Sequence, residues 1–406
     1  MFDRLRLPPG DDEGVVTAFR DGQVTRRENR RSDGFTFATK EIGYQGVRAG
    51  DLVVHSMDGF AGAIGVSEST GKCSPVYVVC DPKPGVDARF HAYVLRHMAL
   101  SGYITSLAKG IRERSTSFGW GELKDEWLPL PTQATQKAIA AFLDRKTAAI
   151  DALIEKKQKL LDLLAEKRAA LINQAVTKGL DPNVPMKDSG IPWIGEIPAH
   201  WEVKRLKFVC TLETGHTPSR SEPSYWVEEE CVIPWVSLND TKTLKQADYI
   251  SETTYKISPL GMANSAAHLI PAGSVVFTRD ATIGLTAILT KPMAVSQHII
   301  GWVCGPKMDN EFLLQVLGSM TQELNRVTFG ATLKTIGMAD VKELTTPLPP
   351  PEAQRQIVAH LRMNLDRIRG MTVRLLSQLD RLNEYRQALI TAAVTGQLDI
   401  TEDAPA

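Results

Sequence analysis

Two glycine-rich stretches have the residue types that could hold a phosphate group. The stretch GVSESTGKCS (65–74) resembles a nucleotide-binding loop. However, five residues rather than four separate Gly65 from Gly71, and Cys73 stands where Ser or Thr would hold magnesium. The stretch GFAGAIG (59–65) lacks the spacing of a dinucleotide-binding loop and lies among strand-like segments. We therefore interpret both stretches as turns between strands.

Other catalytic patterns are missing from the sequence. There is no HExxH or GxSxG motif, no pair of closely spaced cysteines, and no glycine-rich S-adenosylmethionine motif. His91 and His97 lie six residues apart on one expected helix, so we interpret them as surface or hydrogen-bonded core histidines. Asp280, after Arg279, reads as an isolated carboxylate in a turn. The sequence therefore predicts no catalytic residues and no metal site.

Basic and polar clusters remain, and they suit binding to nucleic acid. Arg26, Arg27, Arg30 and Arg31 lie close together with only Glu28 opposing them. Guanidinium groups in such a cluster bind phosphates or guanine edges, and the alternative is a solvated charged turn.

Two Ser/Thr/basic loops occupy equivalent places 218 residues apart. The first comprises Arg112, Arg114, Ser115, Thr116 and Ser117, and the second comprises Thr332, Lys334 and Thr335. Two related loops are a stronger indication of DNA contact than either loop alone.

The second half of the chain adds further candidates for DNA contact. They are His216, Thr217, Ser219 and Arg220, with Arg279 and Gln297. Tyr225 and Trp226 can anchor the first group. Gln297 could read adenine, although a glutamine in a strand also serves as an ordinary ladder or solvent residue.

Two long helices must position these clusters. The first, within 128–181, has no internal Gly or Pro from Thr132 to Thr177, and apolar residues recur every three or four positions. Thr132 is the expected N-cap and Gly179 the expected stop. About 45 helical residues would span roughly 65–70 Å, so the helix needs an equally long partner. Its expected packing residues are Ile139, Leu143, Ile150, Leu153, Leu160, Leu164 and Leu171.

The partner helix is a copy of the first, within 346–399. Gln136 matches Gln354, and the sequence ALI at 170–172 returns at 388–390, both at an offset of 218. A constant offset across a whole helix indicates a duplication rather than two unrelated coiled-coil segments. The packing residues expected here are Ile357, Leu361, Leu365, Ile368, Leu375, Leu379, Leu382 and Leu389.

The duplication predicts the domain organisation. We expect an α+β chain with two similar mixed α/β domains, separated by two long antiparallel helices that form an intramolecular coiled coil with a pseudo-twofold axis. The predicted segments are a first domain (1–127), a helical spacer (128–181), a second domain (182–345, with a linker at 182–201), a second spacer (346–399) and a tail (400–406).

Composition supports this organisation. The length of 406 residues suggests two to four units, and 43% hydrophobic residues suffice for real cores in a soluble protein. No signal peptide is visible, and five widely spaced cysteines (Cys73, Cys80, Cys210, Cys231 and Cys304) read as reduced thiols of a cytoplasmic protein. The formal net charge is zero, so any case for DNA binding depends on local clusters.

Several segments resemble the DNA-specificity subunits of type I restriction–modification systems. The residues that carry the resemblance include the start of the second domain, with PWIGEIPAHW, the two helix starts LPLPTQATQKAI and LPPPEAQRQIV, and the stretch HSMDGFAGAIGVS. TGHTPSRSEPSYW and FTRDATIGLTAIL are also similar to this family. These segments lie at 186–209, 128–151, 348–361, 55–67, 214–226 and 277–289.

The resemblance implies a non-catalytic subunit in which each domain reads half of a split DNA target and the helices set the spacing. It implies docking of two modification (methyltransferase) subunits, and of restriction subunits that translocate DNA. It also implies that S-adenosylmethionine, ATP and magnesium bind those partners and that no cofactor binds this chain. The assembled complex would be a site-specific deoxyribonuclease and adenine methyltransferase that defends against foreign DNA.

The first domain departs from the family pattern. MFDRLRLPPGDDEG begins as if partway into a recognition domain, so the sequence allows an N-terminally shortened reading frame. Such a frame would lack an edge strand and weaken the first half-site.

Two other functions stay open at this point. A scaffold protein would use the coiled coil only to organise other proteins, which leaves the duplicated basic loops without a purpose. An enzyme acting alone would need a catalytic motif that the sequence does not show.

Overall fold

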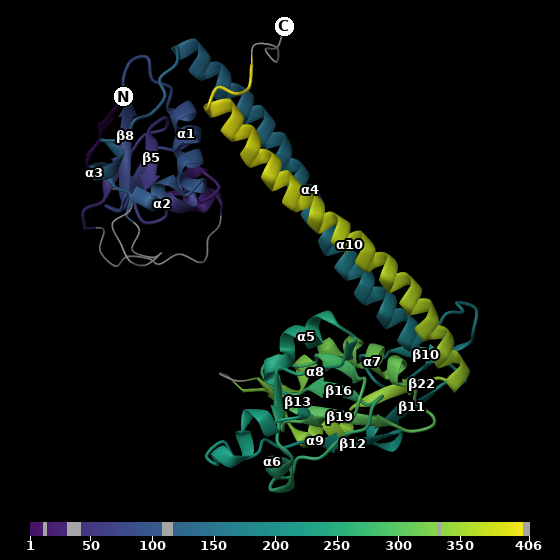
Figure 1. The fold of residues 1–406 in the computed structure, drawn as a ribbon. Helices are drawn as coiled ribbons and strands as arrows, with labels where there is room; N and C mark the ends of the chain where they lie inside the picture. The colour runs from purple at the N-terminus through teal and green to yellow at the C-terminus, as the bar shows by residue number, and fades with distance from the viewer. Residues whose placement is uncertain (11–13, 31–41, 108–116, 331–333, 401–406) are drawn as a thin grey trace. The chain divides into compact units, whose positions relative to one another are not determined.

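The computed structural model describes residues 1–10, 14–30, 42–107, 117–330 and 334–400, and the chain forms two compact units (Figure 1). Unit 1 comprises Met1–Lys159 with Leu375–Ala406, and unit 2 comprises Leu160–Arg374. Each unit therefore combines one globular domain with part of helix α4 (Gln133–Lys178) and part of helix α10 (Pro351–Val394). The linear boundaries predicted for the domains and spacers stay a prediction.

The domain of unit 1 is built on an antiparallel sheet in the order β1–β8–β5–β6. Along β5, Leu52 and Val54 pack in one apolar cluster while Val53 packs in another, because successive side chains of a strand point to opposite faces. The strands of unit 1 are β1 (Phe2–Arg4), β2 (Val16–Ala18), β3 (Val24–Arg26), β4 (Gln45–Val47), β5 (Leu52–His55), β6 (Ile64–Val66), β7 (Gly71–Cys73) and β8 (Tyr77–Pro82). The stretch 65–74 that resembled a phosphate loop contains the end of β6, the turn after it and β7, so the predicted turn between strands is confirmed.

Helix α1 (Ala88–Leu100) lies between this sheet and the long helices. Ala92 and Leu95 pack toward the sheet, whereas Phe90 and Val94 pack against Leu143 of α4. The sequence predicts one helix over 90–104, but Gly102 adopts a left-handed φ of 84° and separates α1 from α2 (Tyr103–Leu107). A short helix, α3 (Trp120–Leu123), precedes α4. The described residues of unit 1 also form the 3-10 turns η1 (Arg27–Asn29) and η2 (Gly59–Ala61).

The domain of unit 2 has a five-stranded sheet in the order β12–β19–β16–β17–β14 and a three-stranded sheet in the order β15–β13–β18. The predicted hairpin over 270–289 is β16 and β17. The predicted linker 182–201 contains the hairpin β9–β10, and its Trp201 is buried in the main core. The strands are β9 (Met186–Asp188), β10 (Glu196–Pro198), β11 (Glu202–Arg205), β12 (Cys210–Thr214), β13 (Ile233–Val236), β14 (Tyr249–Ile250), β15 (Tyr255–Ile257), β16 (Val275–Thr278), β17 (Thr286–Leu289), β18 (Ala294–Val295), β19 (Ile299–Cys304), β20 (Thr328–Phe329), β21 (Thr335–Ile336) and β22 (Thr345–Leu348).

Helix α7 (Asn310–Ser319) has the same role in unit 2 as α1 has in unit 1. Its Phe312, Leu313, Val316 and Leu317 are fully buried in the core that also contains Ile357 and Leu361 of α10. The sequence predicts one helix over 312–327, and the structure divides it into α7 and α8 (Thr321–Arg326). The remaining helices are α5 (Thr241–Gln246), α6 (Pro259–Ala263) and α9 (Met338–Glu343), with 3-10 turns η4 (Leu206–Phe208), η5 (Pro223–Trp226), η6 (Glu228–Glu230) and η7 (Leu238–Asp240).

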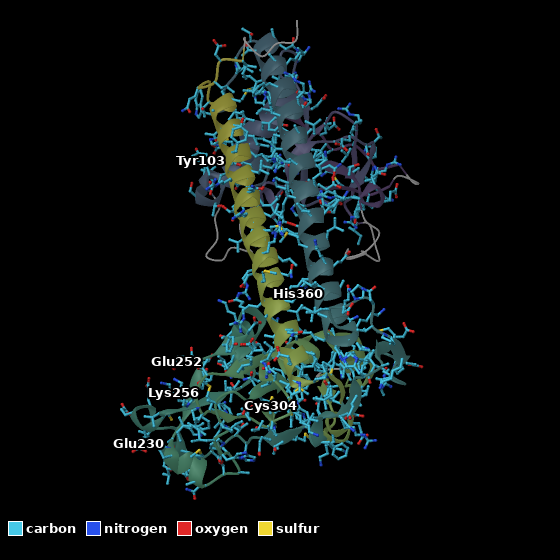
Figure 2. The ribbon with its side chains drawn as sticks, turned by 90° about the vertical axis from the view of Figure 1, so that its right-hand side faces the viewer. Tyr103, Glu230, Glu252, Lys256, Cys304 and His360 are labelled. Atoms are coloured by element: carbon cyan, nitrogen blue, oxygen red, sulfur yellow. The ribbon has the colours of Figure 1, made fainter. Side chains whose placement is uncertain are left out.

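The two long helices lie side by side in Figures 1 and 2 and run antiparallel within each unit. In unit 1, Asp151 pairs with Arg386, and Lys157 donates a hydrogen bond to Gln378. Residue numbers therefore rise along α4 in the direction in which they fall along α10. Thr132 caps α4 by accepting from the amide of Thr135 (3.2 Å), and Gly179 follows α4 with a left-handed φ of 74°, both as predicted. These domains and helices confirm the predicted fold class, while the pseudo-twofold axis stays a prediction.

Most of the expected packing residues are buried or half-buried between the helices, but two are not. Leu153 and Leu160 are 42% and 44% exposed, so the expectation that they pack is wrong. The less exposed positions are Ile154 and Leu161, each one residue later. They continue the four-three repeat from Leu143, Thr147 and Ile150, whereas Leu153 and Leu160 stand one step outside it. The expected residues of α10 are all buried or half-buried.

A buried glutamine locks each domain to its long helix in the same way. In unit 1, Gln136 accepts a hydrogen bond from the amide of Asp87 (2.8 Å) and donates to the carbonyls of Gly85 (3.1 Å) and Pro131 (2.8 Å). In unit 2, Gln354 accepts from the amide of Asp309 and donates to two carbonyls, each at 2.8 Å. Asp87 and Asp309 also cap α1 and α7. We call these two arrangements the glutamine clamps.

Among the described residues, no helix has both the length and the apolar character that a membrane span requires.

Candidate nucleic-acid interface

In unit 2, candidate residues from four separate segments meet at one place. Thr217 follows strand β12, Arg279 and Asp280 follow β16, Gln297 and His298 precede β19, and Thr335 begins β21. The sheet brings these segments together because β16 pairs with β19, and Asp280 forms an isolated antiparallel bridge with Thr335. We call the set Thr217, Asp280, Gln297, His298 and Thr335 the polar cluster.

Hydrogen bonds in the polar cluster converge on Asp280 from two sides. The Thr217 hydroxyl donates to Gln297 Oε1 (2.6 Å), and the Gln297 amide donates to His298 Nε2 (3.1 Å). His298 Nδ1 donates to Asp280 Oδ2 (2.7 Å), and the Thr335 hydroxyl donates to Asp280 Oδ1. These partners assign the imidazole proton to Nδ1, since Nε2 acts as an acceptor. The result is a fixed orientation for the exposed Gln297.

Asp280 is the hub of the cluster, which corrects the expectation that it is an isolated carboxylate. The residue is only 5% exposed, and the Arg279 guanidinium approaches it at 3.6 Å. The sequence could not show this, because His298 and Thr335 lie 18 and 55 residues away. The next residue, Ala281, has a left-handed φ of 60°, and its amide donates to the carbonyl of Lys334 (2.9 Å). The amide of this strained turn thus holds the backbone of the exposed Lys334 beside the cluster.

The loop after β12 is held by aromatic residues, as expected. The indole of Trp226 donates to the carbonyl of Ser219 (2.9 Å), and the Arg220 guanidinium lies 5.3 Å from the Trp226 ring centroid. The indole of Trp235 donates to the carbonyl of His216 (3.2 Å). His216, Ser219 and Arg220 are exposed on this loop.

In unit 1, the residue that follows the equivalent loop makes the same backbone contact. The amide of Phe118 donates to the carbonyl of Ser56, and the amide of Ile336 donates to the carbonyl of Arg279, both at 2.9 Å. Phe118 and Ile336 are both fully buried. The exposed Ser117 therefore stands where Thr335 stands in unit 2.

The arginine cluster of unit 1 has intramolecular partners. The Arg26 guanidinium donates to the carbonyl of Thr70, Arg27 donates to the Thr17 hydroxyl (3.0 Å), and Arg30 pairs with Asp21. Arg30 also lies over the Phe19 ring at 4.2 Å. Burial alone would raise the pKa of Asp21, but the hydrogen bonds from Arg30 and Gln23 lower this pKa below its ordinary value. DNA contact by these arginines stays a prediction.

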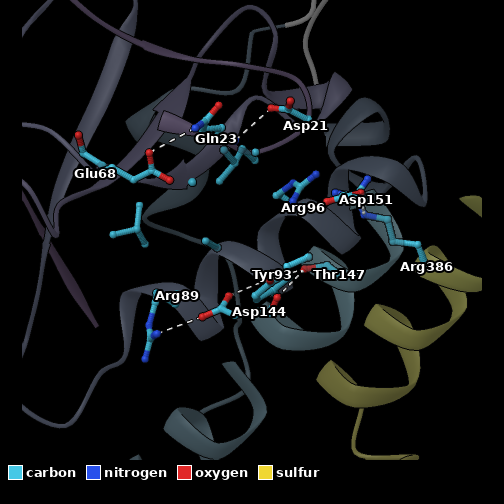
Figure 3. A pocket seen from close by; sticks show the side chains of 17 residues that line it. Asp21, Gln23, Glu68, Arg89, Tyr93, Arg96, Asp144, Thr147, Asp151 and Arg386 are labelled. Atoms are coloured by element: carbon cyan, nitrogen blue, oxygen red, sulfur yellow. Dashed lines mark hydrogen bonds and ion pairs between the residues drawn. The ribbon is translucent and has the colours of Figure 1, made fainter. Parts of the chain in front are cut away.

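Two cavities open beside this cluster. One, of 440 Å³, is lined by Arg20, Arg30, His55, Asp58 and Tyr77 among others. The second, of 760 Å³, lies between the β2–β3 hairpin, α1 and the long helices (Figure 3). Arg96 and Arg386 both line this second cavity, and the Nε atom of each is buried with no hydrogen-bond partner among the described residues. Burial, and then the charge of Arg386, lower the pKa of Arg96.

Some predictions cannot be placed, and others concern residues that the sequence did not single out. Arg31, Arg112, Arg114, Ser115, Thr116 and Thr332 lie outside the described residues, as does most of the tail. The sequence indicates Asp280 only as an isolated carboxylate in a turn, and it offers no local signal for His298. Within the described ranges, no three His, Cys, Asp or Glu residues are grouped as metal ligands. His91 is a buried core histidine, as expected, with its ring nitrogens beside the carbonyls of Asp87 and Pro129.

Comparison with known proteins matches these features to one family. Residues 198–381 match the family described as the type I restriction modification DNA specificity domain. This range covers the second globular domain with its polar cluster as well as part of α10. The match therefore concerns the globular domain and is not limited to the coiled-coil helices.

Individual relatives carry the same description. The MjaIX specificity subunit of Methanocaldococcus jannaschii is 28% identical over 170 residues, which are 41% of this chain and 38% of that protein. The HindI specificity subunit of Haemophilus influenzae is 26% identical over 208 residues, 50% of this chain and 42% of that protein. The chain thus spans about two fifths of the length of these two relatives.

A solved structure has the same fold. It comes from a study of complex assembly and conformational transition of the type I R-M system, with a TM-score of 0.64 and 19% sequence identity. The match covers 87% of this chain and 84% of the other.

Proposed function

We propose that this chain is a specificity subunit of a type I restriction–modification system. In this role it recognises a two-part DNA target and directs partner subunits to it. In this proposal the chain is not itself an enzyme. Modification subunits methylate adenine, and restriction subunits translocate and cleave DNA. S-adenosylmethionine, ATP and magnesium bind to those partners.

One observation carries the proposal: the polar cluster of unit 2. Residues up to 118 positions apart in the sequence, from Thr217 to Thr335, form one hydrogen-bonded group on which Gln297 is exposed and oriented. A glutamine amide reads adenine by donating and accepting at once, provided that its orientation is fixed. The exposed Lys334 and Arg220 supply charges for phosphates, which position a protein on DNA without reading sequence.

The outer surfaces of the long helices support the docking of partners. Met363 and Val373 in unit 2 are 67% and 60% exposed, and Leu376 and Tyr385 in unit 1 are also exposed. Exposed apolar side chains that form a contiguous patch mark protein-binding surfaces. We propose that two modification subunits bind there. The alternative, a scaffold indifferent to DNA, does not account for the polar cluster.

Binding assays on the full chain with its modification subunits test the proposal. The target is first identified as a bipartite modified motif by methylome sequencing of the host. Gln297→Ala should weaken discrimination at one base pair by about 1–3 kcal/mol. Lys334→Ala should weaken binding to every sequence and reduce the salt slope by about 1. Lys245→Ala, an exposed lysine on α5, is the matched control.

Two outcomes would contradict the proposal. One is binding with no sequence preference and no steep fall with salt. The other is a stable complex with partner proteins that DNA does not affect, which would favour the scaffold.

Exchange and insertion experiments test the modular arrangement separately. Replacing residues 205–345 by the domain of a relative should change one half-site and leave the other. Inserting a heptad into both long helices should widen the spacer between half-sites. If both half-sites changed in the first experiment, or the spacer stayed constant in the second, the modular arrangement would be refuted while DNA recognition itself could still stand.

A further inference from the structure

Each globular domain forms an ion pair with a long helix. The domain's residue in this pair lies at the start of α1 in unit 1 and of α7 in unit 2. In unit 1, Arg89 Nη1 of α1 lies 3.0 Å from Asp144 Oδ2 of α4, and the Tyr93 hydroxyl donates to the same carboxylate (2.9 Å). In unit 2, Arg362 Nη2 of α10 donates to both oxygens of Glu311 of α7, at 2.6 and 2.5 Å. The Tyr249 hydroxyl also donates to Glu311.

These two ion pairs occupy equivalent positions with opposite polarity. Arg89 and Glu311 are each the second residue of their helix, directly after α1 and α7 begin at Ala88 and Asn310. Asp144 and Arg362 each lie eight residues after the glutamine of the clamp. The duplication has therefore kept the contact and reversed its charges. The domain contributes the basic residue of the ion pair in unit 1 and the acidic residue in unit 2.

The next heptad position on each long helix repeats the reversal. Asp151 lies seven residues after Asp144, and Arg369 lies seven residues after Arg362. In unit 2, Arg369 lies 3.6 Å from Asp248 of the domain. In unit 1, Asp151 and the domain residue Arg96 line one cavity (Figure 3), and Asp151 pairs there with Arg386 at 3.5 Å.

We propose that this reversed polarity is a recognition code that matches each domain to its own long helix. The glutamine clamps cannot discriminate, because they are the same in both units. Ion pairs of opposite polarity can. A domain seated on the wrong helix would place Arg89 against Arg362, or Glu311 against Asp144.

The code acts against exchange of domains, both within the chain and with a second copy of it. Chains with repeated domains are prone to misassembly because each repeat offers the other a related seat. Specificity is a difference between two affinities, so like charges brought together on the wrong helix add to the discrimination that the matched ion pairs supply. The inference concerns assembly of the chain and does not depend on DNA recognition.

The test refolds three full-length chains that have the same net charge. They are the wild type, a chain with only unit 1 inverted (Arg89→Glu and Asp144→Arg), and a chain with both units inverted (these two changes plus Glu311→Arg and Arg362→Glu). Each is refolded from urea at increasing concentration, and size-exclusion chromatography with light scattering measures the fraction of domain-exchanged oligomer. A chain with only unit 2 inverted repeats the test independently.

The code predicts that only the chains with one unit inverted exchange. In these chains both domains carry the same polarity, and both seats accept either domain, so the oligomer fraction should rise several-fold and increase with concentration. The chain with both units inverted should match the wild type.

Three results would overturn the proposal. One is the same oligomer fraction in all chains. Another is as much exchange in the chain with both units inverted as in the chains with one. The third is failure of every inverted chain to fold, because a matched pair of either polarity should suffice.

Discussion

The glutamine clamp of unit 1 gives a sharp quantitative prediction. Gln136→Ala removes three hydrogen bonds at a residue with no exposed surface. The buried amide of Asp87 loses its acceptor, which costs about 1–3 kcal/mol, and two carbonyls lose a donor at about 0.5–1.5 kcal/mol each. Allowing for non-additivity and for a few tenths regained from the helix propensity of alanine, we expect about 2–4 kcal/mol.

Hydrogen exchange is the right measurement because the loss is local. The chain has two units, so a single global free energy of unfolding is not well defined. Gln136→Ala should accelerate amide exchange at the start of α1 by roughly 30- to 1000-fold, since about 1.4 kcal/mol corresponds to a factor of ten. Gln354→Ala should do the same at the start of α7 and leave α1 unchanged.

Two controls separate the clamp from other causes. Gln133→Ala changes an exposed glutamine on the same turn of α4 and should alter exchange by less than about twofold. Gln136→Leu keeps the volume and removes the hydrogen bonds, so it should resemble Gln136→Ala. Exchange at α1 that is unchanged in Gln136→Ala, or equal to that in Gln133→Ala, would refute the idea that the clamp holds the domain on the helix.

Three further predictions concern Asp280, the packing between the long helices and two buried histidines. Asp280→Ala should destabilise unit 2 by about 1–3 kcal/mol, since Thr335 and His298 lose their acceptor. Amide exchange in unit 2 would show this, and exchange equal to that of the wild type would contradict it. Ile154→Ala should destabilise unit 1 by about 1–2 kcal/mol and Leu153→Ala by less than half of that, as amide exchange in unit 1 would show. The reverse order would indicate that Leu153, and not Ile154, packs between the helices. Burial lowers the pKa of His55 and of His91 below the ordinary 6.5, so the unfolded chain binds protons more readily than the folded chain. Unit 1 should therefore lose stability as pH falls below about 6.5. Replacing both histidines by asparagine should flatten this pH dependence.

Local signals in the sequence were enough to predict the elements that duplication and periodicity define. The constant offset identified both long helices, and the capping residue Thr132 and Gly179 fixed the ends of the first. The choice of Leu153 and Leu160 failed for a physical reason. Both leucines are apolar and fit a three- or four-residue step, but only a continuous four-three repeat keeps a seam facing its partner. Thr147 is buried and Ile154 is half-buried, which shows which phase of the repeat faces inward.

The site was harder to predict because its contacts are long-range. Gln297, Thr217 and Thr335 could be selected one by one by residue type, but nothing local indicates that Asp280 and His298 connect them. The same holds for the junction ion pairs: Glu311 and Arg362 are 51 residues apart, and Arg89 and Asp144 are 55 apart. Aligning the two repeats could have revealed the reversal at 144 and 362, since both positions fall at the same offset.

The two units share the contacts that hold each domain in place, but they differ in the residues beside those contacts. The clamp and the backbone contact of Phe118 and Ile336 are common to both. By the offset that relates Ser56 to Arg279, the place of Asp280 is taken in unit 1 by Met57, a half-exposed apolar residue that cannot act as a hydrogen-bond hub. Two such domains that both read DNA would present different groups to their half-sites. The geometry therefore favours a target whose two halves differ in sequence over a palindromic target.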